Sequence, residues 1–233
     1  MIQMSGWPGA PVAGTRRPVN LLADDRSAES LRAILDRIGF RPGGVIGMEQ
    51  VHGAEIAVVR GRADCVIPAC DGLVTDVPGT ALCVRSADCL PILAYDPVRQ
   101  VVGAVHAGWR GLRSEIVRRL VRVLQEAFQS DPAQLRIEIG PGIGPCCYQV
   151  GTEFAEWAEP HLKHNRAGGL YADLAGLARA QLEGAGVPKP AIQADRACTA
   201  CHPGRLESFR RDGPAAGRMV TAICLGCQIN IVS

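Results

Sequence analysis

The chain has 233 residues, which is long enough for one large domain or two small ones with a sizeable buried core. The 25 lysines and arginines nearly balance the 23 aspartates and glutamates, and a net charge of +2 gives no reason to expect a nucleic acid or an anionic membrane as a partner. No stretch approaches the ~20 apolar residues of a membrane span, and the start of the chain does not resemble a secretory signal. We therefore expect a cytoplasmic protein whose ten cysteines serve in metal binding, catalysis or packing more readily than in disulfides.

The predicted elements alternate between helices and strands along the chain. Residues 1–20 look irregular, and apolar residues at helical spacing behind Ser27 predict a first helix over residues 27–40. Short apolar runs between Gly, Pro and Asp predict strands at residues 45–48, 55–59, 73–75, 81–85, 91–95 and 101–105. Later segments predict helices at 114–129, 152–158 and 173–183, and strands at 135–139, near Ile192 and at 218–225. Since no repeat or linker interrupts this pattern, we expect one mixed α/β domain.

Four cysteines near the end of the sequence have the pairing of a zinc ribbon. Cys198 and Cys201 form CTAC, and Cys224 and Cys227 form CLGC. Two such pairs are the usual tetrathiolate signature, although their separation is slightly longer than that pattern favours. Because CLGC continues an apolar strand, free thiols are the favoured interpretation, and a structural zinc site is the alternative.

A second set of candidate ligands stands at the edges of apolar strands. His52 lies in EQVHGAEIAVV, Cys89 in RSADCLPILAY and His106 in VGAVHAGWRG. A histidine or cysteine alone is more often a packed or hydrogen-bonded residue. Three together, each next to residues that end a strand, favour a shared site, because strand ends are where α/β proteins gather functional groups.

The chemistry of these three residues allows several interpretations. Two imidazoles and one thiolate suit Zn²⁺ with a fourth tetrahedral position left for water, whose pKa zinc would lower to ~7. The same donors suit a blue-copper centre, although five histidines in all are too few for a multicopper cluster. Alternatively, Cys89 is a nucleophile with a nearby histidine as its base. Asp88 and Asp71 are candidates for moving protons or for orienting a ligand histidine.

Short motifs follow one another in a characteristic order: QVHG (50–53), DGLVTD (71–76), SADCLPIL (86–93), GAVHAGWRG (103–111), GPGIGPCCYQVG (140–151), DL (173–174), CT (198–199) and SFRRDGPAAGRM (208–219). In this order they resemble the YfiH family, also called the laccase-domain or multicopper polyphenol oxidase family. Its members are described as zinc-dependent purine nucleoside phosphorylases. Residues 48–225 form the core that carries the motifs, and residues 1–44 are a divergent N-terminal segment.

The resemblance implies a fold of the α/β (α+β) class, with residues 1–233 as a single YfiH-like domain of layered mixed β-sheets flanked by helices. It implies zinc, in preference to copper, held by His52, Cys89 and His106. It also implies phosphorolysis of adenosine, inosine, guanosine and methylthioadenosine, with adenosine deamination as a further activity and editing of peptidoglycan precursors as the alternative role. The partners would be purine nucleosides and phosphate, and the protein would be a monomer or a small homo-oligomer.

These reactions assign expected roles to further residues. In deamination a carboxylate must move a proton, and we expect Asp88 to do so. In phosphorolysis cations must hold phosphate, and Arg110, Arg210 and Arg211 are candidates because a planar guanidinium suits an oxyanion. Arg16, in AGTRRPVNLL, matches the N-terminal arginine of the family and joins them. A metal-independent Cys/His hydrolase and a metal-stabilised binding module are the alternatives, and laccase activity is less favoured.

Overall fold

Two six-stranded β-sheets form the centre of the fold. The structure, a computed structural model, describes residues 2–7, 10–15, 27–164 and 168–227. The first sheet has the order β1 (Ile2–Trp7), β2 (Ala10–Thr15), β15 (Met219–Cys224), β7 (Thr80–Ser86), β3 (Gly44–Met48) and β5 (Asp64–Ile67). The second has the order β14 (Ile192–Ala194), β10 (Arg136–Ile139), β8 (Leu90–Asp96), β9 (Val101–Ala107), β6 (Gly72–Thr75) and β4 (Ile56–Val59).

The two sheets pack face to face through apolar side chains. Successive residues of a strand point to opposite faces, so β7 contributes to two cores. Leu82 and Val84 meet Leu93 of β8 in the core between the sheets. Ala81 and Cys83 point the other way, into a core shared with α1 (Ala28–Arg37). Burial on both faces explains why the central strands read as nearly continuous apolar runs.

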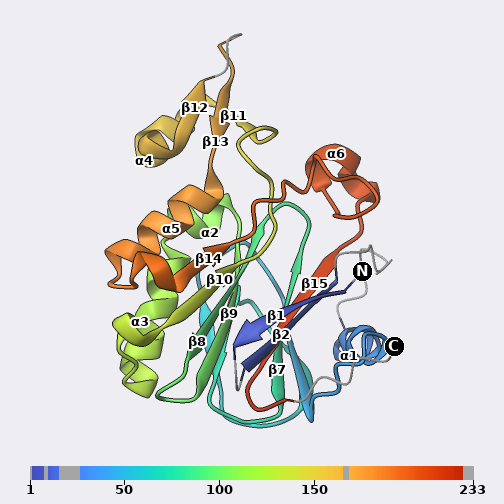
Figure 1. The fold of residues 1–233 in the computed structure, drawn as a ribbon. Coiled ribbons are helices and arrows are strands. Elements are labelled where there is room, and N and C mark those ends of the chain that lie inside the picture. Colours follow the sequence, from blue (N-terminus) through green and yellow to red (C-terminus); the bar gives the residue numbers. More distant parts are fainter. Residues whose placement is uncertain (1, 8–9, 16–26, 165–167, 228–233) are drawn as a thin grey trace.

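Helices cover the outer faces, which gives four layers (Figure 1). On one side α1 covers the first sheet, and on the other α2 (Trp109–Arg113), α3 (Ile116–Phe128) and α5 (Leu174–Gly184) cover the second. The carboxylate of Asp173 accepts a hydrogen bond from the N–H of Gly176 and so caps the start of α5. Among the residues described, no helix has the length and apolar composition that a membrane crossing requires.

A small third sheet extends beyond the four layers (Figure 1). It consists of β11 (Gln149–Val150), β13 (Leu170–Ala172) and β12 (Leu162–His164), and α4 (Ala155–Ala158) lies beside it. The last helix, α6 (Phe209–Asp212), lies in the long connection between β14 and β15. Short 3₁₀ helices complete the fold at η1 (Pro132–Gln134), η2 (Thr152–Phe154), η3 (Glu159–His161), η4 (Lys189–Ala191) and η5 (Gly213–Ala215).

The expectation of mixed sheets flanked by helices is confirmed, and so are the helices predicted over residues 27–40, 114–129 and 173–183. The expectation that residues 1–20 are irregular is wrong for the described residues 2–7 and 10–15, because β1 and β2 form an antiparallel pair that joins β15. Pro and Gly interrupt their apolar pattern, and the strand that completes their pairing comes from the far end of the chain. The short strand β5 was also not predicted, since its four residues carry little periodicity.

Candidate functional site

One edge of the second sheet brings the candidate ligands together. Strands β6 and β8 both run antiparallel to β9, whereas β4 runs parallel to β6. The beginnings of β4, β6 and β8 therefore lie at the same edge as the end of β9. His52 lies shortly before β4, Asp71 directly before β6 and Cys89 directly before β8, and His106 is the penultimate residue of β9.

His52, Cys89 and His106 converge closely enough to share a metal ion. Their potential ligand atoms all lie within 4.8 Å of one another. The two imidazole rings are 4.9 Å apart between centroids and nearly perpendicular, at 80°. His106 is buried and His52 is exposed, so the cluster is closed on the side of the sheet and open toward solvent. Two nitrogens and one sulfur with an open side fit the three-ligand arrangement of a catalytic metal site.

Space for an ion between the ligands depends on Gly108, which follows β9. A Cβ atom at this position would lie 2.8 Å from the Cys89 sulfur and 3.5 Å from Cδ2 of His52. Such a Cβ would therefore crowd two of the three candidate ligands. The glycine in HAGWRG thus leaves these side chains the room that their close approach requires.

The buried carboxylate of Asp71 orients both histidines. One oxygen lies 2.8 Å from Nδ1 of His106 and also accepts the N–H of His52 at 3.0 Å. The other accepts the N–H groups of Val51, at 3.0 Å, and Gly53, at 2.7 Å. With Nδ1 engaged in this way, Nε2 of His106 is the nitrogen available to a metal. A carboxylate behind a ligand histidine is the usual support of such sites.

A second contact fixes the loop that carries His52. The side-chain amide of Gln50 donates to the backbone oxygen of Arg85 at 2.8 Å and accepts the N–H of the same residue at 2.9 Å. His52 and Asp88 both have left-handed backbone conformations, with φ of 60° and 89°. Conformations of this kind cost about 1–3 kcal/mol and persist where the surrounding contacts enforce them. The hydrogen bonds of Gln50 and Asp71 supply that enforcement at His52.

The electrostatics favour charged forms of the cluster. Burial alone would raise the pKa of the Cys89 thiol, but hydrogen bonds and charges from His106 and His52 outweigh it and lower that pKa to about 6. Burial would lower the pKa of His106, yet Asp71 and Cys89 raise it to about 9. Burial likewise opposes the ionisation of Asp71, but its bonds to His106 and Gly53 lower its pKa. A thiolate at neutral pH is the form that binds metals.

A cavity of about 430 Å³ opens over the cluster. Four arginines contribute to its wall, and aromatic side chains line it beside them. Burial raises the pKa of Tyr148 to about 12, so its hydroxyl stays protonated well above neutral pH. Besides the three ligands, the lining consists of Gln50, Arg85, Ser86, Ala87, Asp88, Trp109, Arg110, Tyr148, Phe209, Arg210 and Arg218. The cavity thus combines cationic, aromatic and metal-binding groups.

Asp88 faces this cavity but does not support a ligand histidine in the described contacts. Its two oxygens accept hydrogen bonds from the hydroxyl of Thr199 and from the N–H of Arg210, both at 2.6 Å. Asp71 takes the orienting role for which both aspartates were candidates. Asp88 instead joins the strand end next to Cys89 to the segment that carries α6.

The predicted arginines are placed differently. Arg110 lies over the ring of Trp109, at 4.4 Å from the centroid, and Arg210 lies 5.0 Å from that of Tyr148. Both line the cavity.

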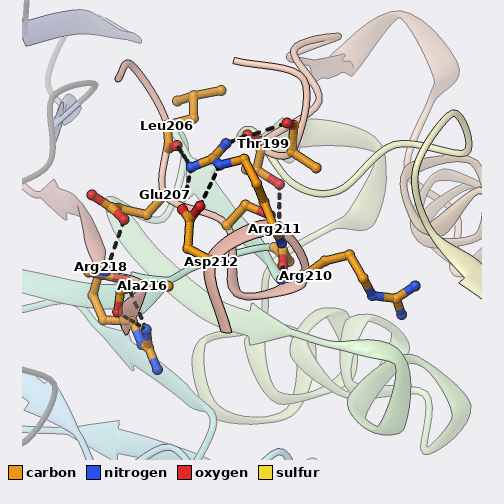
Figure 2. A network of polar contacts seen from close by, with 12 residues as sticks. Thr199, Leu206, Glu207, Arg210, Arg211, Asp212, Ala216 and Arg218 are labelled. Atoms are coloured by element: carbon orange, nitrogen blue, oxygen red, sulfur yellow. Dashed lines mark hydrogen bonds and ion pairs between the residues drawn. The ribbon is translucent and has the colours of Figure 1, made fainter. Parts of the chain in front are cut away.

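Arg211 differs from the expectation of a phosphate ligand, because it is not among the cavity-lining residues and its guanidinium holds the chain together. It donates to the backbone oxygens of Thr199 and Leu206 and pairs with Asp212, while Arg210 points away from this network (Figure 2). Arg16 lies outside the described residues.

Several of the residues that line the cavity were not identified from the sequence. Gln50, Tyr148 and Arg218 lie inside the family motifs, but only the fold brings them together around the cavity. Arg85 and Phe209 likewise reach it from the end of β7 and the start of α6.

The tail cysteines do not form the four-cysteine ribbon. Cys224 and Cys227 are joined by a disulfide, which also contradicts the preference for free thiols there. Cys224 pairs with Ala81 at the start of β7, the opposite end of that strand from Ser86 and the cavity. Cys198 and Cys201 lie instead beside Cys146 and Cys147. The paired strands of the first sheet therefore separate the two halves of the expected ribbon.

Comparison with known proteins places this chain among relatives of known family. Residues 22–226 match the family model described as multi-copper polyphenol oxidoreductase laccase. A Geobacillus stearothermophilus protein named purine nucleoside phosphorylase YlmD is 35% identical over 220 residues, which cover 87% of this chain and 80% of the relative. A Deinococcus radiodurans protein named purine nucleoside phosphorylase is 35% identical over 232 residues, covering 93% and 86%.

Solved structures agree with the sequence relatives. The crystal structure of YlmD from Geobacillus stearothermophilus has a TM-score of 0.83 at 30% identity, and that of the Bacillus licheniformis hypothetical protein YfiH has a TM-score of 0.81 at 27% identity. Each comparison covers 93% of this chain and 92% of the other. Together with the family match over most of its length, these similarities show that the chain belongs to the laccase-like YfiH family.

Proposed function

We propose that the protein is a zinc-dependent purine nucleoside phosphorylase. The observation that carries the proposal is the cavity over His52, Cys89 and His106, because it joins a metal-binding cluster to four arginines and several aromatic side chains. The names of the relatives support this assignment. Adenosine, inosine, guanosine and methylthioadenosine are the proposed substrates.

Zinc is the metal that we propose for the cluster. Two imidazole nitrogens and one thiolate suit its borderline-soft character and its preference for tetrahedral coordination. Zinc bound there would supply Lewis acidity at the floor of the cavity. Copper is disfavoured for oxidase chemistry, because the sequence has five histidines in all.

The residues of the chain can hold both substrates for phosphorolysis. In this reaction a phosphate oxygen attacks the anomeric carbon of the ribose, and the glycosidic bond breaks with its electron pair going to the base. Arg110 and Arg210 face the cavity, and their guanidinium groups can bind phosphate with paired hydrogen bonds and balance its charge. The exposed ring of Phe209 offers a face on which a purine can pack.

Adenosine deamination is a second proposed activity, and Asp88 is the residue that we assign to proton transfer in it. This carboxylate lines the cavity next to Cys89. One of its oxygens accepts a hydrogen bond from the hydroxyl of Thr199 and the other accepts one from the N–H of Arg210, and each retains capacity to accept another from a substrate.

The decisive experiment is a phosphate-dependent release assay on the purified protein. Incubation with inosine should release hypoxanthine and ribose 1-phosphate only when phosphate is present. Release should be lost on chelation, be restored by zinc and be absent in Cys89→Ala. The control is Cys65→Ala, a change on β5 in the other sheet. Unchanged turnover in Cys89→Ala would contradict the proposal.

A metal-independent Cys/His hydrolase is the second candidate, favoured by the thiolate that the two histidines stabilise at Cys89. It predicts activity that survives chelators and a covalent adduct on Cys89.

Editing of peptidoglycan precursors would instead give turnover of muropeptide substrates and none of nucleosides. The same panel of substrates, assayed with and without chelator, separates these outcomes.

A further inference from the structure

A second cluster of potential metal ligands lies outside the cavity. It consists of Cys146 and Cys147, from the loop after β10, and Cys198 and Cys201, from the loop after β14. Their four sulfur atoms all lie within 4.8 Å of one another. The sulfur of Cys201 lies 3.5 Å from that of Cys146 and 3.3 Å from that of Cys147.

The sheet topology creates this cluster. Strands β10 and β14 are parallel neighbours, so the loops that follow them leave the sheet at the same edge. The pairing continues beyond the strands, because Gly142 and Cys198 form a parallel bridge and the N–H of Thr199 donates to the oxygen of Gly142 at 3.0 Å. Two segments far apart in sequence are thereby held side by side with their cysteines facing one another.

The local backbone is shaped around the sulfur atoms. The N–H of Gly144 donates to the sulfur of Cys198 at 3.2 Å, and the N–H of Cys201 donates to the backbone oxygen of Cys198 at 3.2 Å, which closes the CTAC turn. A Cβ at Gly144 would lie 3.2 Å from Cβ of Cys198 and 3.4 Å from the sulfur of Cys146. The glycine therefore allows the close approach of the two loops.

The spacing of the sulfurs suits a tetrahedral ion. A zinc–sulfur bond of about 2.3 Å places neighbouring sulfurs of a tetrahedral site ~3.8 Å apart. The two shortest contacts are slightly below this value, and the 4.8 Å limit lies above it. Soft sulfur ligands select zinc over magnesium or calcium. We propose that Cys146, Cys147, Cys198 and Cys201 form a tetrathiolate zinc site, separate from the cluster in the cavity.

The position of this site gives it a structural role at the cavity wall. Cys147 precedes Tyr148, which lines the cavity. Cys198 precedes Thr199, whose hydroxyl donates to Asp88 and whose backbone oxygen accepts from Arg211 (Figure 2). A metal that joins the two loops would hold both wall segments in place. The proposal does not depend on the reaction that the cavity performs.

Cobalt binding to the Cys89→Ala variant tests the site. This variant retains no cysteine in the cavity cluster, so any sulfur-to-cobalt charge-transfer absorption must come from other cysteines. We expect the reduced Cys89→Ala protein to bind one equivalent of Co²⁺ with the intense absorption of a four-thiolate site. Adding Cys201→Ser should abolish or strongly weaken this absorption. Adding Cys65→Ser instead should leave it unchanged.

A count of metal ions keeps the proposal testable if the Cys201→Ser variant does not fold. Elemental analysis of Cys89→Ala purified with zinc should give one zinc per chain, released when a mercurial reagent titrates the thiols. Absence of zinc from folded Cys89→Ala together with absence of cobalt–thiolate absorption would overturn the proposal. A disulfide between two of the four cysteines, found by mass spectrometry of protein alkylated during purification, would overturn it as well.

Discussion

Replacing Asp71 by asparagine would test how the candidate metal-binding cluster of His52, Cys89 and His106 is supported. The carboxylate accepts from His106 and from the N–H groups of Val51, His52 and Gly53, whereas an amide has one oxygen and one NH₂ group. If the amide oxygen faces Val51 and Gly53, the NH₂ group faces the N–H of His52 and forces Nδ1 of His106 to accept. Nε2 of His106 then carries the proton and cannot bind a metal.

The other orientation of the amide is also unfavourable. With its oxygen toward His106, the NH₂ group meets the N–H groups of Val51 and Gly53, and both lose their acceptor. A donor left without a partner costs about 1–3 kcal/mol when it is buried, and less where solvent can reach it, as at the exposed Val51. Since Gly53 is half-buried, we expect Asp71→Asn to lower the unfolding free energy by about 1–3 kcal/mol. Zinc affinity should fall ~10–100-fold, the usual effect of losing such a support.

Zinc affinity can be measured by competition with a chelating dye, and stability by urea unfolding of the metal-free protein. The control is Asp96→Asn, a buried aspartate at the opposite end of β8 that accepts the N–H groups of Val98 and Arg99. This control should leave zinc affinity unchanged.

The pKa of Asp71 is lowered in the folded state, so its carboxylate stabilises the fold at pH values above the unfolded pKa of about 3.9. This stabilisation is lost as the pH falls through the folded pKa. Wild-type zinc affinity in Asp71→Asn would refute the reasoning.

Three further predictions concern the same cluster. In the metal-free protein, the rate of Cys89 alkylation, followed by peptide mass spectrometry, should increase with pH with a midpoint near the pKa of about 6. Bound zinc should block the alkylation. A midpoint near the ordinary thiol pKa of ~8.5 would contradict the thiolate assignment. Gly108→Ala should weaken zinc binding about 5–150-fold, because overpacking beside the Cys89 sulfur costs about 1–3 kcal/mol. The control is Gly61→Ala, since a Cβ at Gly61 meets nothing within 4 Å. Gln50→Leu removes two hydrogen bonds to Arg85 and should weaken zinc binding in the same dye competition, less than Asp71→Asn does; unaltered affinity would show that the loop needs no such clamp.

Elements with strong apolar periodicity could be predicted from the sequence. Helices α1, α3 and α5 each bury one apolar stripe, which requires apolar residues at helical spacing. The central strands bury both faces, which requires a continuous apolar run. Strands β1 and β2 could not be predicted in this way, because their own residues lack a regular apolar pattern. They are held as strands by their pairing with each other and by that of β2 with β15.

The candidate site shows the same division. His52, Cys89 and His106 could be singled out because each follows or precedes an apolar strand and carries a ligand atom. The orienting role of Asp71 and the cavity positions of Arg85 and Phe209 depend on strand directions and loop paths, which residue spacing does not specify.

The cysteines show most clearly where prediction from the sequence ends. The sequence by itself determined which residues can bind a soft metal, because ligand chemistry belongs to the side chain. Only the tertiary structure decided which of them share a site. Parallel pairing of β10 with β14 brings Cys198 beside Cys147, while the antiparallel pairing of β15 with β7 carries Cys224 to the other end of the first sheet. Partners in a metal site are chosen by strand order and direction, and these are set by the packing of the whole chain.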